Sequence, residues 1–192
     1  MTQDRRGAVV AAVFEETVRL HQGTVQRDSG AILRVVDAVA HTLDAGGKVL
    51  ACGNGGSAAD AQHFAAELVG RFERDRRGLP AMALTTDTSA LTAISNDYGY
   101  ERVFARQVEA HGRRGDVLVC ISTSGGSPNV LAALSAAKAG GLVTVALTGR
   151  DGGAIGAAAD IQVNVPSPST ARVQEVHRTI LHVICQLVEE GI

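Results

Sequence analysis

The sequence predicts an α/β fold in which a five-stranded parallel sheet is sandwiched between two layers of helices, with further helices at the N-terminus. Two observations support this prediction. Short apolar runs alternate with amphipathic stretches along most of the 192 residues, which is the pattern of a parallel sheet covered on both faces. Two glycine-rich turns each follow an apolar run and precede a helical stretch. In this architecture such turns lie beyond the carboxyl ends of the strands, where ligands bind.

The N-terminal part is expected to be helical. Residues 7–27 and 29–43 each have apolar side chains at helical spacing, and Gly46-Gly47 ends the second stretch. The first stretch is amphipathic and has to lie against something, so it suits packing on a partner subunit. We therefore predict an N-terminal helical segment over residues 1–32 that serves oligomer packing, followed by one α/β domain over residues 33–192.

The remaining elements are expected to alternate along the chain. Strands are predicted at 48–52, 80–85, 117–121, 142–147 and 161–165. Helices are predicted at about 57–72, 88–95, 100–112, 128–139, 152–158 and 170–190. A loop is expected at Asn96-Asp-Tyr-Gly99, between the second and third of these helices.

Composition disfavours several classes of partner and location. A net charge of -2 with only 3% aromatic residues provides neither a basic face nor stacking rings, which argues against nucleic-acid binding. Cys52, Cys120 and Cys185 sit in apolar runs and suit small core residues in a reducing cytosol. The apolar stretch 7–14 is too short to span a bilayer and has no convincing cleavage site. We therefore expect a cytoplasmic protein with no membrane anchor.

The first glycine-rich turn, Gly53-Asn-Gly-Gly-Ser57, joins a predicted strand to a predicted helix. Such a turn presents free N–H groups at a helix N-terminus, so a phosphate or a polyhydroxyl group is its natural ligand. The spacing matches neither the dinucleotide fingerprint nor the nucleoside triphosphate loop, and no lysine follows. Ordinary nucleotide binding is therefore disfavoured.

The second turn is rich in hydroxyl groups, from Ser122, Thr123, Ser124 and Ser127. Hydroxyls and backbone N–H groups at a helix N-terminus can hold a phosphate without a cation. The alternative interpretation is a plain turn, in which Ser127 caps the helix and Pro128 occupies its first position. The density of hydroxyls favours the phosphate site.

Two predicted helices contain groups suited to metal binding or proton transfer. His63 and Glu67 lie four residues apart and so project from nearly the same face, although such a pair is more often a surface hydrogen bond than a metal site. The last helix has Gln174, His177 and His182 within an apolar pattern. We interpret His177 as a satisfied packing residue. His182 is more suggestive, because a buried imidazole there needs a donor, an acceptor or a metal.

Four stretches together resemble the bacterial phosphoheptose isomerases, which convert sedoheptulose 7-phosphate to D-glycero-D-manno-heptose 7-phosphate. They are CGNGGSAADAQHFAAEL, LTTDTSALTAISNDYGYERVFARQVEA, ISTSGGSPNV and RVQEVHRTILH. The resemblance covers essentially the whole chain. It implies the sugar-isomerase (SIS) domain, a flavodoxin-like three-layer α/β/α sandwich, whose isomerase branch forms homotetramers with active sites shared between subunits.

The resemblance also implies roles for individual residues. One Zn²⁺ per subunit would be held by His63, Glu67, Gln174 and His182. The sugar phosphate would contact Asn54, Gly55, Gly56, Glu67, Asn96, Asp97, Ser122, Thr123, Ser124, Ser127 and Gln174. Gln174 and His182 are eight residues apart, about 12 Å along a straight helix, so either both side chains reach inward or the ligands come from different subunits. Gly126 stands where many relatives have Asn, so a side-chain contact made there would be missing.

Aldose–ketose isomerisation moves a proton between neighbouring carbons through an enediolate, which requires a base and a group that holds the developing oxyanion. We expect Glu67 to be the base and His182 the acid or relay, with zinc polarising the carbonyl. A carboxylate bound to zinc is a poorer base. Asp60 and Asp97 are therefore kept as alternative proton carriers.

Two other functions are compatible with such a domain. A related group of adaptors binds the replication initiator protein, and Arg71-Phe-Glu-Arg74 and Leu79–Leu84 resemble that group too. We expect adaptors to have lost a carboxylate or imidazole at the position of Glu67 or His182, and this chain has both. A sugar-phosphate-sensing module of a transcription regulator is less favoured, because no DNA-binding segment is attached.

Overall fold

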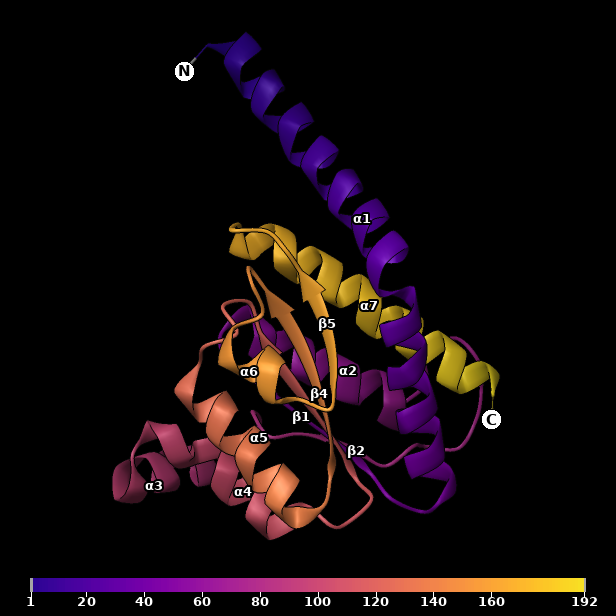
Figure 1. The fold of residues 1–192 in the computed structure, drawn as a ribbon, viewed down its shortest axis with the longest axis vertical. Coiled ribbons are helices and arrows are strands. Elements are labelled where there is room, and N and C mark those ends of the chain that lie inside the picture. The colour runs from indigo at the N-terminus through magenta and orange to yellow at the C-terminus, as the bar shows by residue number, and fades with distance from the viewer. Residues whose placement is uncertain (1, 192) are drawn as a thin grey trace.

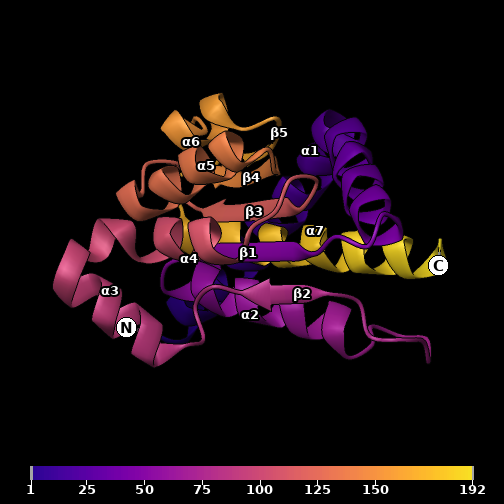
Figure 2. The same cartoon turned by 90° about the horizontal axis from the view of Figure 1, so that it is seen from below.

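The computed structural model describes residues 2–191, and a parallel sheet of five strands forms its centre. The strands are β1 (Val49–Gly53), β2 (Ala81–Ala83), β3 (Val117–Ser122), β4 (Val143–Gly149) and β5 (Ile161–Val165). Their order across the sheet is β2-β1-β3-β4-β5, which can be followed in Figure 2. The predicted α/β class and the five parallel strands are confirmed.

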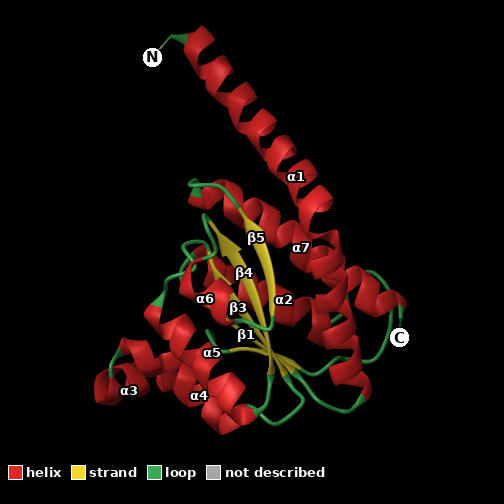
Figure 3. Cartoon of the chain, in the orientation of Figure 1, coloured by secondary structure: helices red, strands yellow, loops and turns green. Residues whose placement is uncertain are grey.

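Helices cover both faces of the sheet, as Figure 3 shows. They are α1 (Gln3–Asp44), α2 (Gly56–Val69), α3 (Thr88–Tyr98), α4 (Val103–His111), α5 (Pro128–Gly140), α6 (Gly153–Ala158) and α7 (Thr170–Glu190), with a 3-10 turn, η1, at Tyr100–Arg102. Side chains from α1, α2 and α7 build one buried core with the sheet. Those from α4, α5 and α6 build a second core on the other face. The molecule is thus the expected three-layer sandwich.

The apolar runs of the strands are explained by this double cover. Val49 and Ala51 of β1 pack into the core under α2 and α7, whereas Leu50 and Cys52 pack into the core under α4 and α5. Successive side chains of a strand point to opposite faces, so a strand buried on both faces is apolar throughout. All three cysteines of the described chain are buried and free, as predicted.

The N-terminal helix differs from the expectation of two helices. Residues 3–44 form one continuous helix, α1, with no break near residue 28. Gly23 and Gly30 lie on it with open space around the position of an added Cβ. Each glycine costs a helix about 1 kcal/mol, but buried side chains from Leu20 to Leu43 keep the same face against the sheet and α7. Tertiary packing therefore outweighs the two weak positions.

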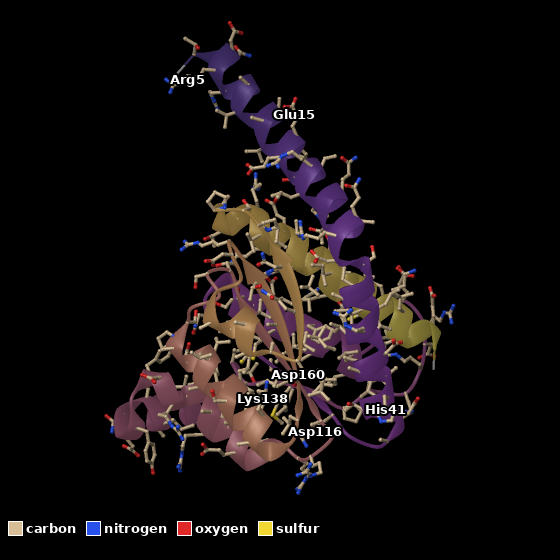
Figure 4. All side chains as sticks on the ribbon, viewed as in Figure 1. Arg5, Glu15, His41, Asp116, Lys138 and Asp160 are labelled. Atoms are coloured by element: carbon tan, nitrogen blue, oxygen red, sulfur yellow. The ribbon has the colours of Figure 1, made fainter. Side chains whose placement is uncertain are left out.

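The first part of α1 extends beyond the rest of the fold (Figure 1). Figure 4 shows Arg5 and Glu15 on this projecting part. Its apolar side chains are exposed, namely Val9, Val10, Val13, Phe14 and Val18. This apolar surface has no partner among residues 2–191.

The loop expected at residues 96–99 is also different. The helix α3 continues through Tyr98, so that Asn96 and Asp97 lie in its last turn. Gly99 by itself ends the helix, because its φ of 82° is accessible to glycine and strained for other residues. The Asn-Asp pair therefore does not break the helix that precedes Gly99.

Two features of the topology bear on ligand binding. From β1 the chain crosses to β2 on one side, and β3 lies on the other side, so that the carboxyl ends of β1 and β3 flank the point where the winding reverses. Ligands of such sheets bind at this point. Within residues 2–191, no helix combines the length and the apolar character that a membrane crossing requires.

Candidate functional site

The loop after β1 is shaped by glycines at close contacts. A Cβ on Gly53 would lie 2.8 Å from the carbonyl oxygens of Ile121 and Ser57, and Gly55 has a φ of 55°. A Cβ on Gly56 would lie 2.4 Å from Nε2 of Gln174, on α7. The turn into α2 therefore requires glycine at positions 53 and 55, whereas the Gln174 amide beside Gly56 is the end of a flexible side chain.

Asn54, in the same loop, is held by two residues that the sequence analysis did not single out. Its Nδ2 donates to Oδ1 of Asn129 at 2.8 Å, and Nδ2 of Asn129 donates back to its Oδ1 at 2.9 Å. The Tyr100 hydroxyl also donates to that oxygen, at 3.1 Å. Asn129 is 3% exposed. The Asn54 amide thus ties β1 to α5 and η1, and a cavity of about 290 Å³ lies beside it.

A sequence signal for Asn129 did exist. It is a polar residue in the otherwise apolar first two turns of a helix, directly after Pro128, and a buried amide needs partners. The sequence could not say which residue it would meet, because Asn54 is 75 positions away.

The loop after β3 gathers three hydroxyls. Ser122 Oγ lies 3.1 Å from Ser127 Oγ and 3.5 Å from Ser124 Oγ, and Ser124 Oγ accepts from the Gly126 N–H at 3.2 Å. Ser127 occupies the N-cap position of α5, yet its side chain makes no capping hydrogen bond. The Ser127 hydroxyl therefore does not cap the helix, as the plain-turn alternative required. These hydroxyls can rotate to donate to an anion at the start of α5.

This second loop is packed tightly against the turn that precedes α6. Gly125 has a φ of 65°, and a Cβ there would lie 2.1 Å from the carbonyl oxygen of Gly152. The Gly125 carbonyl accepts from the Ile155 N–H at 2.9 Å. The hydroxyl cluster therefore rests on a fixed backbone.

A second group of polar side chains meets where α2 lies beside α7. His63 Nε2 is 2.8 Å from Nε2 of His182 and 3.3 Å from Oε1 of Glu67. The two imidazole rings have centroids 5.0 Å apart. The side chains of His63 and Glu67 are 36% and 22% exposed, so the group is open to solvent. The structure thus brings together three of the four predicted zinc ligands.

The spacing of this trio can be compared with that of a zinc site. Ligand atoms of a tetrahedral zinc with bonds of about 2.1 Å lie about 3.4 Å from one another. The His63–Glu67 separation of 3.3 Å agrees, whereas the 2.8 Å between the imidazoles is shorter. As they stand, no three His, Cys, Asp or Glu side chains of residues 2–191 form a ready metal-binding group. The donor set fits zinc after the rings separate by roughly half an ångström.

His182 is held in its neutral form. Burial lowers the pKa of His182 most, and the neighbouring His63 lowers it further, while Glu67 acts in the opposite direction. Phe72 packs against the same imidazole, with ring centroids 5.6 Å apart. A neutral imidazole is the form that can bind a metal or accept a proton.

Gln174 occupies a different place on the same helix pair. Its amide lies against Gly56, at the start of α2, and it is eight residues, or about 12 Å, from His182 along α7. Between them Arg178 binds Asp60, with Nη2 and Nε at 2.6 and 3.1 Å from Oδ1. A cavity of about 320 Å³ lies at this end of the helix pair. One chain therefore does not bring Gln174 to the two histidines.

Asn96 and Asp97 stand apart from both groups. They are exposed, they lie on α3, and Asn96 Nδ2 donates to Asp97 Oδ1 at 2.8 Å. No side chain of α3 is buried. Neither residue hydrogen-bonds to the two loops or to the helix pair within the part of the chain that the structure describes.

His177 is a core residue, as interpreted from the sequence. It is fully buried, and its Nε2 donates to the Thr148 carbonyl at 2.9 Å. Burial lowers the pKa of His177. Its Nδ1 has no partner among the described residues. This histidine fastens α7 to β4 and takes no part in the trio.

Comparisons with known proteins agree with the fold and the motifs. The SIS domain family matches residues 13–149. A phosphoheptose isomerase from Roseiflexus is 57% identical over 176 residues, which cover 92% of this chain and 89% of that protein.

Two solved structures superpose along the whole chain. The phosphoheptose isomerase of Neisseria gonorrhoeae has a TM-score of 0.90 at 49% identity, covering 98% of this chain and 100% of that one. The phosphoheptose isomerase of Francisella tularensis has a TM-score of 0.93 at 39% identity, covering 99% and 100%. The chain therefore belongs to the SIS domain family and, within it, to the phosphoheptose isomerases.

Proposed function

We propose that this protein interconverts sedoheptulose 7-phosphate and D-glycero-D-manno-heptose 7-phosphate, as an aldose–ketose isomerase of heptose biosynthesis. The observation that supports this most is the trio of His63, Glu67 and His182, in which a carboxylate and a neutral imidazole lie on facing helices. The relatives reported above bear the name of this enzyme. The chain also keeps both groups whose loss we expect in an adaptor, so the isomerase is favoured over initiator binding.

Glu67 is proposed as the base that removes the proton from the carbon next to the carbonyl. A positioned base contributes about 10²- to 10⁴-fold to such a step. The contact with His63 uses Oε1 of Glu67, and Oε2 remains to accept the proton. Asp60 is a weaker candidate because Arg178 binds its carboxylate, and Asp97 lies on α3, away from the trio.

His182 is proposed to move the second proton, between the two oxygens of the enediolate. Its lowered pKa keeps the imidazole neutral near pH 7, so that one ring nitrogen could hold the metal while the N–H of the other gives its proton to one oxygen and then takes a proton back from the other oxygen. The contacts with His63 and Phe72 restrict the orientation of the ring.

We further propose one Zn²⁺ per subunit, held by His63, Glu67 and His182. Zinc in such a position supplies a Lewis acid for the sugar carbonyl. Gln174, the fourth predicted ligand, would come from a neighbouring subunit, because one chain leaves it about 12 Å from His182 along α7. This arrangement agrees with active sites shared between subunits.

The phosphate of the substrate is assigned to the loop after β3. Ser122, Ser124 and Ser127 offer hydroxyls at the start of α5, with Thr123 between them. The Asn54-Gly-Gly56 turn is assigned to the sugar. The Asn54 oxygen already accepts two hydrogen bonds, so the contributions of this turn are backbone N–H groups and the remaining Nδ2 hydrogen.

A homotetramer is proposed for the assembly and the cytoplasm for the location. The exposed apolar side chains on the projecting part of α1 support packing against other copies. Light scattering coupled to size exclusion would give the mass, with four times 19.8 kDa expected.

The deciding experiment is to incubate the purified protein with sedoheptulose 7-phosphate, with and without a chelator, and to follow heptose 7-phosphate by NMR. Turnover that chelation abolishes and added zinc restores is expected. Absence of turnover in the presence of zinc would overturn the isomerase function. Full turnover after exhaustive chelation would overturn only the proposed role of the metal and leave the isomerase function standing.

A further inference from the structure

The ends of α2 and α7 that lie beyond the trio are joined by buried charges. The chain leaves α2 at Val69 and reaches β2 through a connection that begins with residues 70–76. We call these seven residues the 70–76 segment. Two charged side chains organise it, Arg76 within the segment and Glu189 in the last turn of α7. Both side chains are nearly inaccessible, at 9% and 3% exposure.

Glu189 holds the backbone of the segment. Its carboxylate accepts from the N–H groups of Phe72, Glu73 and Arg74 at 3.0, 2.8 and 2.8 Å. Burial acts to raise the pKa of Glu189, but these three hydrogen bonds and the charge of Arg76 outweigh it and lower the pKa to about 2. The carboxylate is therefore ionised at any pH where the protein works.

Arg76 closes the end of α2. Its Nη2 donates to the carbonyl of Glu67 at 2.9 Å, and its Nη1 donates to the carbonyls of Leu68 and Gly70 at 2.9 and 3.2 Å. The last carbonyls of a helix have no partners within the helix, so this guanidinium satisfies them. Arg76 Nε lies 3.0 Å from Oε1 of Glu189, as an ion pair without hydrogen-bond geometry. One side chain thus touches both the backbone of Glu67 and the carboxylate on α7.

These contacts lead directly to the trio. Glu189 lies seven residues, or two turns, after His182, so both side chains project from the same side of α7 toward α2. The segment that Glu189 holds also places Phe72 against the His182 ring, at 5.6 Å between centroids. Arg76 binds the main chain at Glu67 itself. No other ion pair between the described parts of α7 and the 70–76 segment makes this connection.

We propose that Arg76 and Glu189 are a positioning pair, which sets the separation between Glu67 on α2 and His182 on α7. This inference rests on the proposed function, because the groups being positioned are its base and its proton relay. Neither residue of the pair touches the substrate in this proposal. The pair acts by fixing the backbone at Glu67 and the ring contact at His182.

The test uses Arg76→Gln and Glu189→Gln in the full-length protein, with two matched controls. The controls are Arg77→Gln and Glu190→Gln, which remove the same charges from exposed neighbours. Far-UV circular dichroism checks the fold. The measured quantities are kcat and KM for sedoheptulose 7-phosphate, and the affinity for zinc alone by competition with a chromophoric chelator.

We expect both positioning variants to lose about 10- to 100-fold in kcat and in zinc affinity, as outer contacts of metal sites do, with KM changed less than about twofold. The controls should match the unaltered protein. Folded variants whose kcat and zinc affinity equal those of the controls would overturn the proposal. An unaltered protein without turnover would overturn the proposed function instead, and the zinc affinities would still judge the positioning pair.

Milder variants decide the case in which the glutamine variants do not fold. Arg76→Lys keeps the charge but cannot reach three carbonyls and Glu189 together, and Glu189→Asp keeps the carboxylate on a shorter arm. Reduced kcat and zinc affinity in these folded variants would support the pair. Unchanged kcat and zinc affinity in these variants would overturn the positioning role. Failure of all four variants to fold would also overturn it, because Arg76 and Glu189 would then be required only for folding.

Discussion

The candidate site has two halves that are built from different chemistry. The loop half, Asn54 and Ser122–Ser127, consists of neutral amides, hydroxyls and backbone N–H groups at the carboxyl ends of β1 and β3. The helix half, His63, Glu67 and His182, consists of groups that can gain or lose a proton. Neutral donors can hold a phosphate without taking part in proton transfer. The difference indicates that binding and chemistry can be damaged separately.

The two halves are also held in different ways. Tight backbone packing and a reciprocal amide pair fix the loop half, through Gly125 against Gly152 and Asn54 against Asn129. Buried charges at the ends of α2 and α7 fix the helix half, through Arg76 and Glu189. The loop half should therefore be insensitive to pH, whereas the support of the helix half contains an ionised carboxylate.

The largest expected effect comes from the helix half. Glu67→Gln removes the proposed base while keeping the size of the side chain, so kcat should fall by about 10²- to 10⁴-fold. KM should change little, because the proposed phosphate site lies in the other half. Steady-state kinetics with sedoheptulose 7-phosphate measure both quantities, and Glu109→Gln on α4 is an exposed control. Full activity in Glu67→Gln would place the base elsewhere.

The next largest effect is expected from a substitution in the loop half. Ser122→Ala removes the hydroxyl that contacts both Ser124 and Ser127. A hydrogen bond to a charged group contributes about 1.5–3 kcal/mol, so KM should rise about 10- to 100-fold while kcat stays within a few-fold. Ser135→Ala, on the exposed side of α5, is the control. A fall in kcat with unchanged KM would mean that this hydroxyl serves the chemistry, and the two halves would not be separable.

A smaller effect tests the support of the loop half. Asn129→Asp removes the Nδ2 donor that reaches Asn54 and places a carboxylate in a buried site. We expect the free energy of unfolding to fall by about 1–3 kcal/mol, because a buried acceptor loses a partner. Urea denaturation measures this change. Tyr100→Phe, which removes only the exposed hydroxyl bond to Asn54, should cost less, and the reverse order would contradict this account.

The last test concerns the pH dependence of the helix half. The pKa of Glu189 is about 2 in the fold, against a reference of 4.5. The ionised carboxylate therefore stabilises the fold above about pH 4.5, and this contribution is lost as the pH falls toward 2. The difference in unfolding free energy between the unaltered protein and Glu189→Gln should be constant above pH 5 and shrink by pH 3, in urea titrations at each pH. A difference that does not vary with pH would contradict the lowered pKa, and Glu190→Gln provides the baseline.

Much of this architecture could be predicted from local pattern. Buried parallel strands are apolar throughout, and the runs at β1, β3 and β4 were recognisable for that reason. Four-residue spacing placed His63 and Glu67 on one side of α2. Parallel topology put both glycine-rich turns at the same edge of the sheet.

Local sequence pattern failed to predict the bounds of two helices, α1 and α3. The apolar spacing suggested two helices, at 7–27 and 29–43, yet the buried face from Leu20 to Leu43 belongs to one continuous helix. Asn96 and Asp97 suggested a loop, yet they belong to the last turn of α3. In both places the neighbouring turns of the helix and their packing, which composition does not report, decided the boundary.

By itself the sequence determined the sheet, the positions of the two glycine-rich turns and which helices contain ionisable groups, because periodicity reports the buried face of each element. Only the tertiary structure decided the partners. His182 meets His63 across 119 positions, Glu189 meets residues 72–74 across more than 110, and Gln174 lies against Gly56 instead of the histidines. The register in which α7 packs along α2 selects these pairs, and that register depends on the whole core.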